Sequence, residues 1–100
     1  MRTSSLVGLV LIGVGCNPVK SDFDNLCHAQ ERSGSMGTSP EDYANAMRWA
    51  DRAMRTQEAR GVVGRLATMS PYDKGTFLRA EAAKVGVSPC PLADSWAPPQ

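Results

Sequence analysis

The sequence contains few of the residues from which enzyme and metal sites are commonly built. Only one histidine, His28, occurs in 100 residues, together with three cysteines. His28 and Glu31 would lie on one helical face, but a structural or catalytic zinc site needs three or four ligands. Neither a Gly-x-Ser-x-Gly sequence nor a phosphate-binding glycine loop is present. We therefore expect no catalytic residue, no metal site and no activity as an enzyme.

An excess of one charge and a long apolar run are also missing. The chain has 11 Lys and Arg against 10 Asp and Glu, a net charge of +1. No overall field therefore draws it toward nucleic acid, and we expect no nucleic-acid partner. The longest apolar stretch, residues 6–15, would span about 15 Å as a helix, roughly half of a bilayer's hydrocarbon core. It is too short to cross a membrane but has the length typical of the apolar region of a secretory signal.

The apolar stretch follows a single basic residue, Arg2, and ends in Val14-Gly15-Cys16. This segment resembles the signal peptides of bacterial lipoprotein precursors, in which small residues precede the cysteine at the cleavage site. Gly13 stands where that family usually has leucine. The resemblance implies cleavage between Gly15 and Cys16 and a covalent lipid on Cys16, with no other cofactor. The alternative is an ordinary secretory signal that leaves Cys16 as a free thiol.

The same resemblance implies a location in the bacterial cell envelope. Two or three acyl chains on Cys16 would anchor the protein stably, whereas one chain binds a membrane only reversibly. Asn17, rather than aspartate, follows Cys16, which in enteric bacteria favours the outer membrane. The alternative localisation is a soluble secreted or periplasmic protein.

Cleavage after Gly15 would leave 85 of the 100 residues, enough for one small domain. Because the removed segment contains Arg2, ten basic residues would then face ten acidic ones. We assign residues 16–20 to the lipidated cysteine and a tether, residues 21–97 to a helical domain, and residues 98–100 to a C-terminal tail.

The two remaining cysteines, Cys27 and Cys90, are expected to form a disulfide, as is common in exported proteins. The bridge would close a loop of about 64 residues, for which the chain-entropy model gives about 4 kcal/mol. In a domain of this size such a contribution is comparable with the whole free energy of folding.

Helix-start signals and apolar spacing predict about four short helices. Ser39-Pro40 and Ser70-Pro71 each combine an N-cap hydroxyl with proline at the first helical position. The expected helices run from Ser21 to near Arg32, from Ser39 to near Met54, from Thr56 or Gln57 to near Leu66, and from Ser70 to Gly86. No alternating apolar pattern indicates a strand. The predicted fold is all-α, a small bundle of about four short helices held by one disulfide.

Apolar residues at helical spacing define the faces expected to be buried. These are Phe23, Leu26 and Cys27; Tyr43, Ala46, Met47, Ala50, Ala53 and Met54; Val62, Val63 and Leu66; and Phe77, Leu78, Ala82 and Val85. Gly61 and Gly64 either weaken the third helix or let another helix approach closely. Residues 87–97 contain Pro89-Cys90-Pro91 and are therefore not expected to be regular helix throughout. Leu92 and Trp96 are expected to press back onto the bundle beside the cystine.

A basic stretch gives one candidate binding surface. Residues 48–65 contain five arginines but only two acidic residues, Asp51 and Glu58. Arg48, Arg52 and Arg55 are expected on one face with Trp49 close by, where they would bind an anionic envelope polymer or an acidic patch of an envelope protein. Alternatively, this face is solvated and carries the helical ion pairs Arg48–Asp51 and Arg55–Glu58.

These features together predict a small membrane-anchored lipoprotein that acts as a non-catalytic binding or accessory subunit. Its binding surface would be the face of Arg48, Arg52 and Arg55 or an apolar groove beside Trp49 and Trp96. The alternative is a structural spacer of the envelope without a specific ligand. A more remote alternative is an envelope hydrolase.

Overall fold

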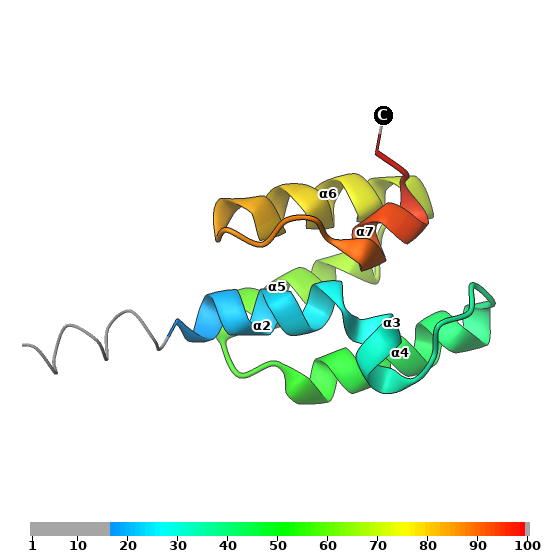
Figure 1. Ribbon diagram of the computed structural model, residues 1–100, viewed down its shortest axis with the longest axis horizontal. Coiled ribbons are helices and arrows are strands. Elements are labelled where there is room, and N and C mark those ends of the chain that lie inside the picture. The colour runs from blue at the N-terminus through cyan, green and yellow to red at the C-terminus, as the bar shows by residue number, and fades with distance from the viewer. Residues whose placement is uncertain (1–16, 100) are drawn as a thin grey trace, which may run out of the picture.

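The computed structural model describes residues 17–99, which fold into six helices without a strand (Figure 1). The helices are α2 (Pro18–Cys27), α3 (Ala29–Ser33), α4 (Pro40–Ala53), α5 (Gln57–Leu66), α6 (Pro71–Lys84) and α7 (Pro91–Trp96). The predicted all-α fold is confirmed within this part of the chain. Four helices have ten residues or more; the short α3 is the end of the expected first helix, and the short α7 is additional to the expected four.

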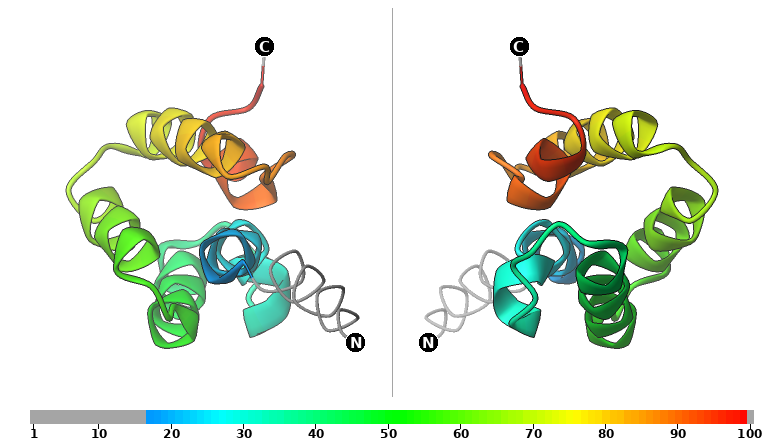
Figure 2. Two further views of the ribbon diagram at one scale, coloured as in Figure 1. Left: turned by 90° about the vertical axis from the view of Figure 1, so that its left-hand side faces the viewer. Right: turned by 90° about the vertical axis from the view of Figure 1, so that its right-hand side faces the viewer.

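Helix α2 lies on the inner side of an arc formed by α4, α5 and α6, which follow one another around it (Figure 2). Helix α7 lies beside α6 and closes the other side of α2. The core between these helices contains the apolar residues whose spacing predicted their burial. Completely or almost completely buried are Phe23, Leu26, Ala46, Ala50, Met54, Val62, Leu66, Leu78, Ala82 and Leu92.

The predicted starts of α4, α5 and α6 are confirmed, and in each a hydroxyl caps the first turn. The Oγ atom of Ser39 accepts a hydrogen bond from the amide of Asp42 at 3.1 Å. Thr56 and Ser70 cap α5 and α6 in the same way. After α6, Gly86 adopts a φ of +83°, a left-handed conformation that glycine takes without steric cost.

The first helix begins at Pro18, so the prediction of a start at Ser21 was wrong. Proline lacks an amide hydrogen, but the first helical position does not need one. The Oδ1 atom of Asn17 accepts a hydrogen bond from the Lys20 amide at 3.0 Å and supplies the cap. Residues 18–20, which were assigned to a tether, are therefore helical, and Val19 packs against the core.

The predicted helix up to Arg32 is interrupted at His28, which separates α2 from α3. The C-terminal segment is not helical throughout, as predicted: residues 87–90 are not helical, and Pro91–Trp96 forms a short helix with Cys90 at its N-cap. Leu92 is fully buried and Trp96 is partly buried against the core, as predicted.

The expected disulfide joins Cys27 at the end of α2 to Cys90 at the start of α7. The two Sγ atoms are 2.12 Å apart and the two Cα atoms 4.7 Å apart. Both residues are buried. The bridge therefore fixes the C-terminal helix to the central helix of the domain.

Candidate functional site

The four residues of the predicted basic face are divided between α4 and the turn that follows it. Arg48 and Arg52 lie one turn apart on α4 and are exposed. Arg55 lies beyond the end of α4, where its amide donates a hydrogen bond to Oδ2 of Asp22 at 2.8 Å. Trp49 is partly buried and packs against the core. Three exposed arginines thus lie along α4 and just after its end, with Trp49 partly buried beside them, and a common binding face stays a prediction.

The ion pairs expected on this face do not form among residues 17–99. The four ion pairs of this part of the chain are Asp24–His28, Asp24–Arg32, Arg79–Asp94 and Glu81–Lys84. Arg48 instead donates a hydrogen bond to Oδ1 of Asn45.

Two other arginines of the basic stretch have structural contacts. The guanidinium of Arg60 donates hydrogen bonds of 3.0 and 3.2 Å to the carbonyl of Met54 at the end of α4. The guanidinium carbon of Arg65 lies 4.4 Å from the centre of the Phe77 ring, within range of a cation–π interaction. The local excess of arginine therefore has in part a structural explanation.

An apolar groove of about 720 Å³ lies beside Trp96. It is bounded by the first half of α4, the turn between α5 and α6, the first turn of α6 and the end of α7. Its lining residues are Thr38, Pro40, Tyr43, Ala44, Met47, Ala67, Pro71, Lys74, Ser95 and Trp96. Its volume is within the range of small-ligand and peptide sites. Trp49 does not line it, so the predicted groove forms at Trp96 but not at Trp49.

The stacked rings of Tyr43 and Trp96 form one wall of the groove. The ring centroids of Tyr43 and Trp96 are 5.6 Å apart, and the ring planes make an angle of 24°. Stacked pairs of this kind are more favourable than their buried area alone implies. The pair thus links α4 to α7 at this wall.

The charge of the groove is positive. Lys74 is the only charged residue among the described lining residues, and its Nζ atom lies 5.2 Å from the centre of the Trp96 ring. Pro40 and Pro71, at the N-terminal ends of α4 and α6, also line the groove. Helix N-termini carry partial positive charge. The first turns of α4 and α6 already contain Glu41, Asp42 and Asp73, so Lys74 is the group on the groove lining that would favour an acidic ligand over a basic one.

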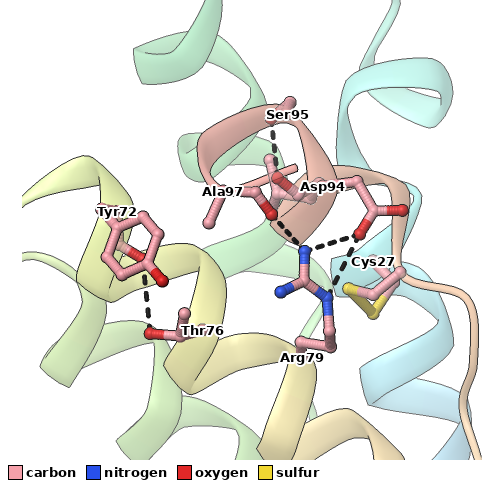
Figure 3. A network of polar contacts seen from close by, with 9 residues as sticks. Cys27, Tyr72, Thr76, Arg79, Asp94, Ser95 and Ala97 are labelled. Carbon is pink, nitrogen blue, oxygen red and sulfur yellow. Dashed lines mark hydrogen bonds and ion pairs between the residues drawn. A yellow bond between two sulfur atoms is a disulfide. The ribbon is translucent and has the colours of Figure 1, made fainter. Parts of the chain in front are cut away.

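A polar network holds α7, and with it Trp96, against α6 (Figure 3). The guanidinium of Arg79 donates two hydrogen bonds to Oδ1 of Asp94, at 2.8 and 3.3 Å, and another to the carbonyl of Ala97. Gly75 permits the close approach of the two helices, as an added Cβ would lie 2.7 Å from the carbonyl oxygen of Ala93. These contacts fix the position of α7 and therefore of Trp96 in the groove wall.

Sequence reasoning identified Trp96 but missed Tyr43 and Lys74 as groove residues. Tyr43 was predicted only as a member of a buried stripe. The signal that was available is the pair of Ser-Pro helix starts, since both open onto the same groove. The sequence alone does not show that two helix starts 31 residues apart meet in space.

A second, smaller cleft of about 430 Å³ lies beside the start of α2. Its lining residues are Asn17, Lys20, Ser21, Asp24, His28, Gly86, Val87, Ser88 and Pro89. The Nδ1 atom of His28 hydrogen-bonds to the carbonyl of Asp24 at 2.9 Å. Among residues 17–99 no three side chains of metal-ligating type lie together around His28 or elsewhere.

No family model, curated protein sequence or solved structure matches the chain. Within residues 17–99 no helix is sufficiently long and apolar to span a bilayer. The apolar stretch of residues 6–15, the cleavage position at Gly15 and the lipid attachment at Cys16 lie outside the described residues.

Proposed function

We propose that this protein is a bacterial envelope lipoprotein that binds a partner protein through the groove beside Tyr43 and Trp96. The observation that carries the proposal is the groove itself, with its stacked aromatic wall and a single cation, Lys74. The lipoprotein assignment rests on the signal-like residues 1–15 and on Cys16.

The lining of the groove favours an apolar segment of a protein that carries an acidic residue. Ala44, Met47 and Ala67 leave space for apolar side chains, and methionine adapts readily to different partners. Lys74 would pair with a carboxylate at the edge of the bound segment. Aromatic residues near the centre of a contact commonly contribute most of its binding energy.

Two helices separate the groove from the start of the domain. Both α4 and α6 have 14 residues, about 21 Å in length, and both begin at the groove. Their far ends lie near α2: Arg55, after α4, bonds to Asp22, and the Gly86 backbone, after α6, lies near Lys20. In Figure 1 the start of α2 and the groove residues are correspondingly at opposite ends. With Cys16 anchored, the groove would face away from the membrane, where a partner can reach it.

The anchor is tested by mass spectrometry of the protein purified from membranes, with and without reduction. We expect a mature chain that begins at Cys16 and carries two or three acyl chains. If the cystine is closed, reduction should raise the mass of the protein by about two hydrogens. A full-length chain with an unmodified Cys16 would refute the anchor.

The groove is tested by photo-crosslinking in intact cells. A photoreactive amino acid replaces Ala44, which lines the groove, or Ala83, which is exposed near the opposite end of α6. We expect a discrete protein adduct from position 44 and none from position 83. Lys74→Glu should weaken the adduct about tenfold through like-charge repulsion with the acidic partner, whereas Lys84→Glu should leave it unchanged.

Equal adducts from both positions, or an adduct insensitive to the charge of Lys74, would refute the groove as the binding site. No adduct from either position would favour the alternative of an envelope spacer without a specific ligand.

A further inference from the structure

The cleft at the start of α2 has a position and a charge that the proposed binding groove does not explain. It lies between the first turns of α2 and the loop of residues 86–89. Asn17, which lines it, is the residue directly after Cys16. Because α2 begins at Pro18, no flexible tether separates the proposed lipid attachment from this cleft.

The cleft presents one free cation and two free hydroxyl groups. Lys20 forms no ion pair with any carboxylate among residues 17–99, and it extends toward the backbone of Gly86. The hydroxyls of Ser21 and Ser88 also line the cleft and have no hydrogen-bond partner in the described part of the chain. These three groups are donors suited to an anionic oxygen.

The one carboxylate in the cleft already has a cationic partner from outside the cleft lining. Asp24 forms an ion pair with Nη1 of Arg32 at 3.0 Å. The charge of Lys20 is therefore not balanced within the cleft. This arrangement favours a small anion over a cation or a neutral ligand.

We propose that this cleft binds the phosphodiester headgroup of an anionic phospholipid in the membrane that anchors the protein. The inference rests on the proposed lipid attachment at Cys16, because the attachment keeps headgroups beside the cleft at high effective concentration. Even a weak site would then be occupied. The second contact would fix the orientation of the domain, with the groove of Tyr43 and Trp96 directed away from the bilayer.

The test is a lysine footprint of the lipidated protein on vesicles. The chain contains three lysines, Lys20, Lys74 and Lys84. An amine-reactive ester labels the protein on vesicles of phosphatidylcholine alone or of an equimolar mixture with phosphatidylglycerol, and mass spectrometry reports each site. We expect phosphatidylglycerol to lower Lys20 labelling about fivefold, the effect of one basic residue at an anionic surface. Labelling of Lys74 and Lys84 should stay unchanged.

A matched variant separates the cleft from diffuse attraction to the surface. Ser21→Ala together with Ser88→Ala removes both hydroxyl donors, which are on exposed residues, and should reverse much of the Lys20 protection. Equal protection of Lys20 and Lys84, or unchanged protection of Lys20 in the double variant, would overturn the headgroup site. Inorganic phosphate that protects Lys20 equally well on phosphatidylcholine vesicles would overturn it in favour of a soluble ligand.

Flotation of the vesicles before labelling distinguishes the absence of a headgroup site from the absence of the lipid anchor. Protein that does not float with either vesicle lacks the proposed lipid attachment. Protein that floats with both vesicles but shows no protection of Lys20 is anchored and has no headgroup site.

Discussion

Gly75→Ala is expected to destabilise the domain, although alanine is the better helix former. Gly75 is buried in α6 where α7 crosses it. An ideal Cβ on this residue would lie 2.5 Å from the Cβ of Ala97 and 2.7 Å from both the carbonyl oxygen of Ala93 and the amide nitrogen of Ala97. Two of these three atoms belong to the backbone, so no side-chain rotation relieves the clash.

The magnitude follows from two opposing terms. Added volume in a well-packed interior costs about 1–3 kcal/mol, while replacing glycine within a helix gains about 0.5–1 kcal/mol. Helix α7 cannot move away freely, because the cystine fixes Cys90 at its start and Arg79 binds both Asp94 and the carbonyl of Ala97 at its end. We therefore expect a net loss of about 1–2 kcal/mol in the free energy of unfolding.

Gly64→Ala is the matched control within the same chain. Gly64 lies in α5, and an added Cβ would meet no heavy atom within 4 Å. The same chemical change should there stabilise the protein by about 0.5–1 kcal/mol. The two variants are thus predicted to have effects of opposite sign.

The assay is urea unfolding of the oxidised protein in detergent, followed by far-ultraviolet circular dichroism. The midpoints should order as Gly64→Ala above wild type above Gly75→Ala, with similar slopes. A Gly75→Ala variant as stable as wild type would refute the close packing of α6 on α7.

Two further stability predictions use the same unfolding assay. Asp22→Ala should cost about 3 kcal/mol, because the buried carboxylate accepts three hydrogen bonds of 2.8 Å from Arg55 and Thr56; a loss below that of the half-exposed control Asp24→Ala would contradict it. The double substitution Cys27→Ala and Cys90→Ala should cost about 4 kcal/mol, since the bridge closes a loop that spans most of the domain. Equal stability of oxidised wild type and this variant would show that the bridge does not constrain the unfolded chain.

Much of the fold could be predicted because local signals and tertiary packing agree in α4, α5 and α6. Ser39 and Ser70 cap the helices that their Ser-Pro sequences predict. In α4, for example, the residues at helical spacing include the buried Ala46 and Ala50. Local chemistry and the apolar period were sufficient for these elements.

Prediction failed where a contact distant in sequence decides the role of a residue. Asp22 has no sequence feature that sets it apart from other carboxylates near a helix start, yet it is 2 % exposed and binds the turn after α4, more than 30 residues away. A close helix approach was one of two alternatives for Gly61 and Gly64, but nothing lies within 4 Å of a Cβ at either position, and the close approach occurs at Gly75. Composition and spacing do not distinguish these glycines.

The candidate groove was predictable only in part for the same reason. Trp96 carried a sequence signal, an aromatic residue near a cysteine, while Lys74 carried none. Of the predicted basic face, Arg48 and Arg52 lie on α4, whereas Arg55 follows the end of that helix. A helical pattern projects residues onto one face only as far as the helix extends.

The groove wall includes Trp96 of α7, a helix too short to fold on its own. A six-residue helix such as α7 does not form in isolation, because helix nucleation is unfavourable and so few residues cannot compensate for it. The position of Trp96 is therefore set by the cystine at Cys90, the Arg79–Asp94 pair and the close approach at Gly75. Since all three lie outside the groove, changes there should alter the proposed partner binding without touching a groove residue. The stability of the domain and the proposed binding would then be coupled through α7.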